Sequence, residues 1–173
     1  MANQTPDANV TYRVYNAGQF LIGTAQIDLP AINSMTAEVK GAGIAGAIDK
    51  SIIGMFQAMS MTFNFRTFTA GGIELLYASQ QHLECWAAVQ ETDPGTGKFV
   101  VKQHKIVTRG EFKNLSPGKL SVAETQDRSI EMEVVYFKED YGGVEHIEID
   151  KYNHIYRVDG VDQLSAVRAA IGM

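Results

Sequence analysis

The chain has 173 residues, of which 45% are hydrophobic and 20% are charged, and its formal net charge is −5 at pH 7. These values indicate one folded domain and exclude a disordered chain, and the negative charge disfavours a nucleic-acid-binding surface, which normally carries clustered Lys and Arg. Cys85 is the only cysteine, so the sequence excludes an internal disulfide and a thiolate metal cluster. Residues 1–7 lack the basic start and apolar run of a secretory signal, and we expect folding in a reducing cytosol.

The first half of the chain contains alternating segments that predict antiparallel strands. Residues 11–15 and 19–27 are expected to pair as a hairpin around Asn16-Ala17-Gly18, because Asn and Gly tolerate turn dihedrals. Residues 34–40 and 60–68 each place apolar and polar side chains on opposite faces, which is the pattern of a half-buried strand.

Between the last two strands lies segment 41–59, which is rich in glycine and in large apolar side chains. Connections between elements are usually about 4–6 residues long and polar. Glycine and the charges of Asp49 and Lys50 make the segment a poor bilayer span. We interpret it as the tip of a long hairpin that docks onto another copy of the protein; the alternative is a helix folded back over its own sheet. The expected contact residues are Ile44, Ile48, Ile52, Ile53, Met55, Phe56 and Met59.

The middle of the chain predicts a helix followed by a second hairpin. Residues 69–80 place Ile73, Leu76 and Tyr77 on one helical face behind a Thr69 cap. Residues 83–92 and 99–109 are expected to pair around Asp93-Pro94-Gly95-Thr96-Gly97, which has the composition of a turn.

The last third predicts a loop, three strands and a short helix. Residues 110–123 are expected to form the loop, and the strands cover 128–138, 144–150 and 152–158. The C-terminal helix is expected to start near Gly160 and end near Gly172. The fold is therefore mainly β, with about eight mostly antiparallel strands and two helices.

The motifs that could carry chemistry are weak. Gly41-x-Gly43-x-x-Gly46 matches the dinucleotide fingerprint, but the strand before it is amphipathic and no acid for a ribose follows at the usual distance. His146, Glu148 and Asp150 share a strand face, yet no second histidine lies at ligand spacing. Glu131 and Glu133 also share a face, but their surroundings predict a wet surface and not the burial that raises a carboxyl pKa. We predict no enzyme activity, no metal site and no cofactor.

Several stretches together resemble a known family. They are the hairpin Glu38–Met59 with its Ala/Gly-rich tip, Met61-Thr62-Phe63-Asn64-Phe65, the strand Glu131–Phe137, and the run Val158-Asp159-Gly160-Val161-Asp162-Gln163-Leu164 with Arg168 and Ile171-Gly172 after it. This pattern resembles the major tail tube protein of contractile-tailed bacteriophages and of phage-tail-like bacteriocins (tailocins), from about Tyr15 to Met173.

The resemblance implies a single tail tube domain over residues 1–173, built from two packed antiparallel β-sheets (a β-sandwich or barrel-like fold) with a flanking helix, a long β-hairpin loop and a short C-terminal helix. It implies a hexameric ring, stacked through an inter-ring hairpin loop at about 41–59 into a hollow tube that conducts DNA or ions. One sheet of each subunit would join its neighbours around the channel. The candidates for lining that channel are Thr36, Glu38, Lys40, Thr62, Asn64, Arg66, Ser129, Glu131 and Glu133.

The partners that the resemblance implies are other copies of the chain and the tail sheath, tape measure, baseplate and tail terminator proteins, with no membrane anchor. The expected location is the tail of a virion or a released tail-like particle, assembled in the host cytoplasm. Two alternatives stay open: the tube of a type VI secretion or extracellular contractile injection system, and a β-barrel that binds a small ligand.

Overall fold

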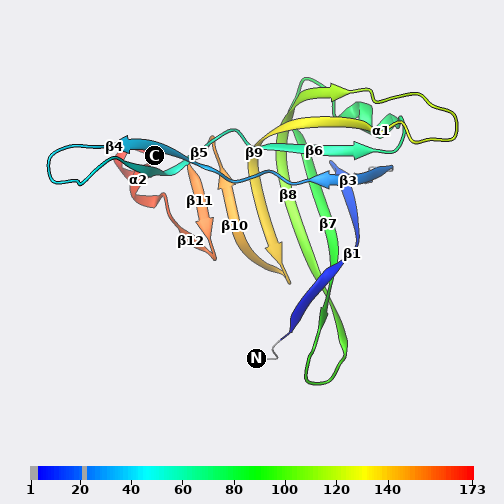
Figure 1. Cartoon of the computed structure of the whole chain (residues 1–173), viewed down its shortest axis with the longest axis horizontal. Coiled ribbons are helices and arrows are strands. Elements are labelled where there is room, and N and C mark those ends of the chain that lie inside the picture. The colour runs from blue at the N-terminus through cyan, green and yellow to red at the C-terminus, as the bar shows by residue number, and fades with distance from the viewer. Residues whose placement is uncertain (1–3, 21–22) are drawn as a thin grey trace.

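The computed structural model describes residues 4–20 and 23–173, and most of its regular structure is β-strand (Figure 1). Every strand pairing among these residues is antiparallel, and the two helices are short, which confirms the predicted fold class. In chain order the elements are β1 (Thr5–Asn16), β2 (Gln19–Phe20), β3 (Thr24–Asp28), β4 (Ser34–Val39), β5 (Ile48–Phe56), β6 (Ser60–Phe65), α1 (Ala70–Glu74), β7 (Gln81–Thr92), β8 (Phe99–Ser116), β9 (Arg128–Tyr141), β10 (Val144–Asp150), β11 (Ile155–Val158), β12 (Val161–Asp162) and α2 (Ser165–Ala170).

Two long strands, β8 and β9, connect two layers of sheet. The upper layer in Figure 1 consists of β3, β6, residues 128–133 of β9 and residues 111–116 of β8. The lower layer continues from the other halves of β8 and β9 to β7, β1 and β2 on one side and to β10, β11 and β12 on the other. The pairing of β8 with β9 shifts at Arg109/Gly110. A Cβ at Gly110 would lie 2.5 Å from the carbonyl oxygen of Glu133, so only glycine fits where the strands change layer.

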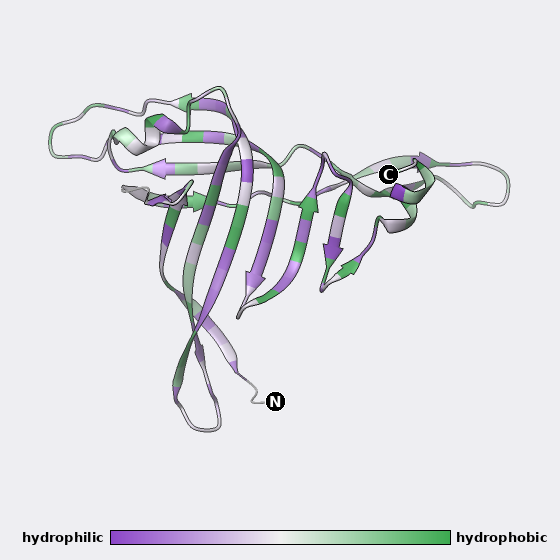
Figure 2. Ribbon diagram, turned by 180° about the vertical axis from the view of Figure 1, so that it is seen from behind, coloured by the Kyte–Doolittle hydropathy of each residue, from purple (hydrophilic) through white to green (hydrophobic). Residues whose placement is uncertain are grey.

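The hydrophobic core lies between the two layers. The predicted alternation of β6 is confirmed, because Met61, Phe63 and Phe65 are buried while the residues between them are half exposed. The lower layer supplies Val14, Leu83, Cys85, Ile106, Phe137 and Ile149, and β9 adds Ile130, Met132 and Val134. Burial raises the pKa of the Cys85 thiol to about 12, as expected of a packing residue. The apolar and polar residues therefore alternate along the strands (Figure 2), and each layer keeps one face for the core.

The N-terminal hairpin is only partly as predicted. β1 pairs with β2 around Asn16-Ala17-Gly18, with Ala17 and Gly18 both at positive φ. The expected second strand does not continue to residue 27, because β3 leaves β1 and pairs with β6 in the upper layer. The predicted strand also includes residues 21 and 22, which lie outside the described residues.

Segment 41–59 belongs to a long hairpin, as predicted, but much of it is a strand and not the tip, and the predicted strand pairing is wrong. Residues 48–56 form β5, which pairs with β4, so the hairpin is β4–β5 and not 34–40 with 60–68. We call residues 34–56 the arm. It extends away from both layers (Figure 1), and it neither forms a helix nor folds back over the sheet. The β-branched residues Ile48, Ile52 and Ile53 favour this strand in spite of the flanking glycines.

Other element boundaries also differ from the prediction. Thr69 caps α1 as expected. The helix nevertheless ends at Glu74 and not near residue 80, because its two glycines disfavour helical backbone. β8 continues to Ser116 through what was predicted to be a loop, since a bulge at Lys113 hides the alternation. The predicted C-terminal helix starts only at Ser165, because Val161–Asp162 pairs with β11 as β12.

Candidate assembly surfaces

The face of the upper layer that points away from the core is polar. Thr62 lies directly opposite Glu131, Asn64 opposite Ser129, and Ser60 opposite Glu133, so the residues of β6 and β9 share this face. β3 adds Gln26 and Asp28 at its edge. Asp28 accepts hydrogen bonds from the Asn64 amide at 3.0 Å and from the Gln26 amide at 2.6 Å.

Two lysines neutralise Glu131 and Glu133 on this polar face. Lys113 Nζ lies 3.0 Å from Glu131 Oε1, 3.8 Å from Glu133 Oε2 and 2.7 Å from Ser60 Oγ. Lys151 Nζ lies 3.5 Å from Glu133 Oε1. The hydrogen bond from Lys113, followed by that from Ser60, holds the pKa of Glu131 below its ordinary value. The face is therefore hydrated and mixed in charge.

Both edges of the upper layer have unpaired backbone groups. Among the described residues, β3 pairs only with β6, and residues 111–116 of β8 pair only with β9. Each edge strand therefore presents a row of free N–H and C=O groups, which another strand can satisfy. An edge of this kind either is protected by its own chain or pairs with a second chain.

The arm carries large apolar side chains that its own chain does not cover. All residues of β4 are exposed, and so is most of β5. On the arm, Ile53 is 60% and Ile48 is 53% exposed, and Ile44, Ile52 and Met55 are also exposed. Glu38 and Lys40 on the arm lie 3.0 Å apart and neutralise each other. An apolar surface of this size on a thin projection is typical of a contact with another molecule.

The base of the arm is held by three contacts with the body. The Phe56 ring meets the Tyr156 ring edge-on, with centroids 5.1 Å apart. Lys151 Nζ donates to the carbonyl of Gln57 at 3.1 Å. The third contact is the buried side chain of Leu164, which covers Gly54 so closely that a Cβ there would lie 2.4 Å from it. The arm therefore leaves the body in a defined direction.

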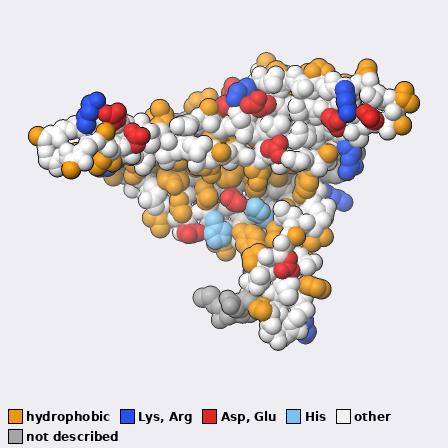
Figure 3. Space-filling view, in the orientation of Figure 1, with side chains coloured by type: hydrophobic (Ala, Val, Ile, Leu, Met, Phe, Trp, Pro, Cys, Tyr) orange, Lys and Arg blue, Asp and Glu red, His pale blue; other side chains and the backbone are white. Residues whose placement is uncertain are grey.

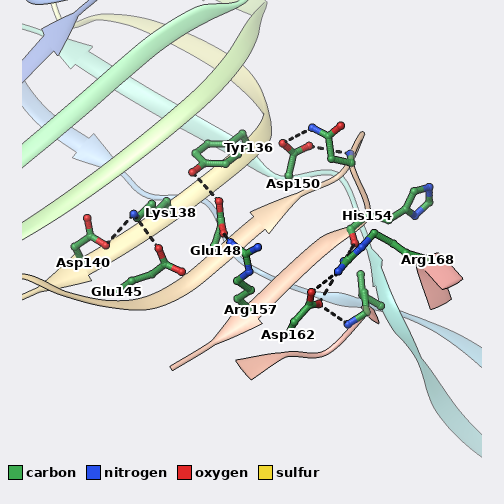
Figure 4. Close-up of polar contacts among 12 residues, drawn as sticks. Tyr136, Lys138, Asp140, Glu145, Glu148, Asp150, His154, Arg157, Asp162 and Arg168 are labelled. Atoms are coloured by element: carbon green, nitrogen blue, oxygen red, sulfur yellow. Dashed lines mark hydrogen bonds and ion pairs between the residues drawn. The ribbon is translucent and has the colours of Figure 1, made fainter. Parts of the chain in front are cut away.

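Ion pairs keep the C-terminal strands and α2 together beside the arm (Figure 4). Arg168 pairs with Asp162 and donates to the carbonyl of His154 at 2.8 Å, which ties α2 to the β11–β12 region. The hydrogen bond from Arg168 lowers the pKa of Asp162. Arg157 reaches Glu148 at 2.6 Å. These contacts explain why the C-terminal run is rich in paired charges.

The structure separates the residues predicted to line a channel into two sets. Thr62, Asn64, Ser129, Glu131 and Glu133 lie together on the polar face, and Arg66 follows the last residue of β6. The second set, Thr36, Glu38 and Lys40, lies on the arm, because β4 pairs with β5 and not with β6.

Two of the seven residues predicted to form the contact are not on the exposed part of the arm. Met59 is 0% exposed and belongs to the core, where its N–H donates to Glu133 and its carbonyl accepts from Val134. Phe56 is half-buried at the base of the arm. Of the seven predicted contact residues, Ile44, Ile48, Ile52, Ile53 and Met55 are exposed and available to contact another molecule.

Sequence reasoning missed Asp28, Lys113 and Lys151 on the polar face. The alternation Glu111-Phe112-Lys113 was a usable signal that the strand continues, although the bulge after it breaks the pattern. Within residues 4–20 and 23–173 no group of three or more His, Cys, Asp or Glu could hold a metal ion. Neither helix in this part of the chain has the length and apolar character that crossing a membrane requires.

Comparison with known proteins gives concordant results. The family described as phage tail tube protein FII matches residues 10–172. The tail tube protein of Escherichia phage P2 is 28% identical over 151 residues, which cover 85% of this chain and 86% of that protein. Among solved structures, the sheath/tube terminator of an extracellular contractile injection system (PVC, extended state) aligns with a TM-score of 0.54 and 10% identity, over 80% of this chain and 99% of that one. At that identity the structural likeness concerns the fold alone.

Proposed function

Because the chain belongs to the phage tail tube protein FII family, whose members are structural and not enzymatic, we propose that its copies form hexameric rings that stack into the inner tube of a contractile tail. The number six and the stacking come from the resemblance of the sequence to tube proteins. The family assignment removes the reason for considering a ligand-binding barrel.

The observation that carries the proposal is the upper layer, which combines a polar face with two unpaired edges. In a ring, β3 of one copy would pair with residues 111–116 of β8 in the next copy. This pairing would satisfy the backbone groups of both edges and remove the aggregation hazard of open strands. The core face would remain inside each copy, so the polar face would line the bore.

Simple geometry supports a bore wide enough for large cargo. If each of six copies contributes its four upper-layer strands at a spacing of about 4.8 Å, the circumference is roughly 115 Å and the backbone diameter about 37 Å, before strand tilt widens it. Lys113 and Lys151 are neutralised by Glu131 and Glu133, and Asp28 adds negative charge. A lining without excess Lys and Arg would let DNA slide through, because little counterion release would hold the phosphates.

Outside the tube we expect a contractile sheath, and at its ends a baseplate and a terminator protein, with a tape measure protein inside during assembly. The location would be the tail of a virion or a released tail-like particle. These partners follow from the family, of which the phage P2 relative is a tail tube protein.

A second candidate within the same class is the tube of an extracellular injection system. The fold is similar to that of a terminator of such a system, which is compatible with this candidate, but the sequence match is to the phage family and covers almost the whole chain. A capsid gene and a terminase gene beside the coding sequence would favour the phage, and their absence would favour a bacteriocin or injection system.

Electron microscopy of the purified protein tests the proposal, with hollow tubes or six-membered rings as the expected result. Dispersed monomers over a range of protein and salt concentrations would contradict it. A reconstruction in which β3 and residues 111–116 of β8 remain unpaired would reject the proposed ring closure.

The arm provides the second test, through the double substitution Ile52→Asp/Ile53→Asp. Both side chains are exposed, so we expect an unchanged circular dichroism spectrum. Docking would bury the rest of each side chain. The resulting free energy of association is about 1 kcal/mol per residue, because each side chain is already partly covered in the free protein. Two charges in that contact should therefore leave rings that do not stack. Tubes of normal length would contradict a role of the arm in stacking.

A further inference from the structure

The upper layer has two rims, at which its strands begin and end. At one rim β3 ends at Asp28 and β6 begins at Ser60, and the arm is the connection between them. At the opposite rim β6 ends, β8 ends at Ser116 and β9 begins at Arg128. Residues 117–127, which we call the rim loop, connect these last two strands. The arm and the rim loop thus lie at opposite ends of the molecule (Figure 1), and apolar side chains occur at both ends (Figure 3).

The rim loop exposes apolar side chains almost completely. Leu120 is 91% and Val122 is 98% exposed, and Phe68, which follows β6 at the same rim, is 58% exposed. Single exposed apolar residues are common on protein surfaces. Here Leu120, Val122 and Phe68 all lie at one end of the molecule, on or beside the rim loop.

Gln126 ties the two ends of the rim loop to each other and to the chain after β6. Its side chain donates to the carbonyl of Pro117 at 2.8 Å and accepts from the N–H of Phe68 at 3.0 Å. Its backbone N–H donates to the carbonyl of Arg66, and its carbonyl accepts from the N–H of Lys119. Gly118 packs so tightly there that a Cβ would lie 2.0 Å from the Gln126 carbonyl oxygen. The tip is therefore presented at a fixed place.

We propose that the rim loop, together with Phe68, is the surface that receives the arm of a copy in the next ring. This inference rests on the proposed function. When identical rings stack in one direction, the contact is head-to-tail, and the end that carries the arm must meet the opposite end of the next copy. In a barrel closed through β3 and β8, the opposite end is the rim that carries Leu120 and Val122.

The charges of the two ends fit this contact. Lys119 lies 3.2 Å from Glu124 and 3.7 Å from Asp127 within the rim loop, and Glu38 lies 3.0 Å from Lys40 on the arm. The arm carries two acids and two lysines (Glu38, Asp49, Lys40 and Lys50), so its charges cancel. Lys119 offsets one of the two acids of the rim loop, so no like-charge repulsion opposes contact between the apolar residues of the two ends.

The test is the double substitution Leu120→Asp/Val122→Asp, compared with Val144→Asp as a matched control. Val144 is exposed but is the first residue of β10, next to the turn between β9 and β10 and away from both rims. We expect the rim-loop variant to keep the circular dichroism spectrum and to form single rings. Its mean tube length by electron microscopy should fall at least tenfold, while the control forms tubes like the unsubstituted chain.

The outcomes separate this inference from the proposed function. If the unsubstituted chain forms neither rings nor tubes, the proposed function fails. If the unsubstituted chain and the rim-loop variant form tubes of equal length, the inference is overturned and the proposed function stands.

Disulfide trapping identifies the contact directly. A chain with Ile53→Cys and Leu120→Cys, and likewise one with Ile48→Cys and Val122→Cys, should form a ladder of covalent oligomers longer than dimers when assembled tubes are oxidised, because each copy is linked at both ends. The native Cys85 is buried and does not compete. Absence of a ladder in both chains, with intact tubes, would overturn the inference.

Discussion

Glu131 and Glu133, two residues apart on the same face of β9, make different contacts. Glu131 interacts with Lys113 at the surface, and this hydrogen bond lowers its pKa. Its contribution to stability is therefore present above the ordinary pKa of a glutamate and is lost as the pH falls below it. Glu133 has a structural contact as well, because it accepts the N–H of Met59 at 3.0 Å where the chain returns from the arm.

We predict that Glu133→Ala destabilises the protein more than Glu131→Ala. Removing Glu133 leaves the N–H of the buried Met59 without its acceptor, which costs about 1–3 kcal/mol. Removing Glu131 breaks a surface ion pair, which costs about 0–1 kcal/mol. Urea unfolding of the two variants measures the difference in the free energy of unfolding. Equal losses would mean that the contact between Glu133 and Met59 contributes nothing.

The residue patterns predicted which side chains of a strand are polar and share a face, but not which strands lie side by side. Alternation in 60–65 and 128–134 was enough to place Thr62, Asn64 and Glu131 on one face, because a period of two fixes the face of a strand. Alternation within one strand does not reveal which strand is its neighbour. For that reason Glu38 and Lys40 were placed with these residues, although they lie on the arm.

At the scale of elements, the direction of the arm depends on a close contact between β5 and the residue before α2. Gly54 has a φ of +68° within a bulge of β5, and the side chain of Leu164 occupies the space where a Cβ would be. Arg168 and Asp162 in turn hold α2 against β12. The C-terminal helix therefore braces the arm.

We predict that Gly54→Ala is more harmful than Gly97→Ala. Both glycines have a φ of +68°, but the space around Gly97 is open, so alanine there meets only the backbone strain, about 1–2 kcal/mol. At Gly54 the new methyl group must also displace Leu164. We expect the melting temperature of Gly54→Ala to lie several degrees below that of Gly97→Ala. Equal melting temperatures would show that Leu164 moves aside without cost.

The arm also shows which features of a whole element the sequence does not predict. Its apolar residues correctly marked it as unusual, yet glycine and the Asp49–Lys50 pair concealed a strand, and its partner β4 was assigned to the wrong neighbour. The sequence does not show that Met59 is buried, because its burial depends on residues distant in the chain: its carbonyl accepts the N–H of Val134 in β9, and its side chain belongs to the core. Local propensity does not contain that information.

At the scale of the whole molecule, the two rims differ, so the proposed tube has a direction along its axis. The rim-loop variant Leu120→Asp/Val122→Asp would keep a working arm, and the arm variant Ile52→Asp/Ile53→Asp would keep a working rim loop. Neither could stack with itself, because every contact of a head-to-tail stack needs one end of each kind.

This difference between the two ends gives a prediction for a mixture of the two variants. When rings of each variant are formed separately and then mixed, one intact arm end meets one intact rim-loop end, so pairs of rings should form. The pair has two defective outer ends, and growth should stop there. Analytical ultracentrifugation should show a species with twice the mass of a ring in the mixture and single rings in each separate sample. Long tubes in the mixture, or single rings only, would show that the arm and the rim loop are not the two halves of one contact.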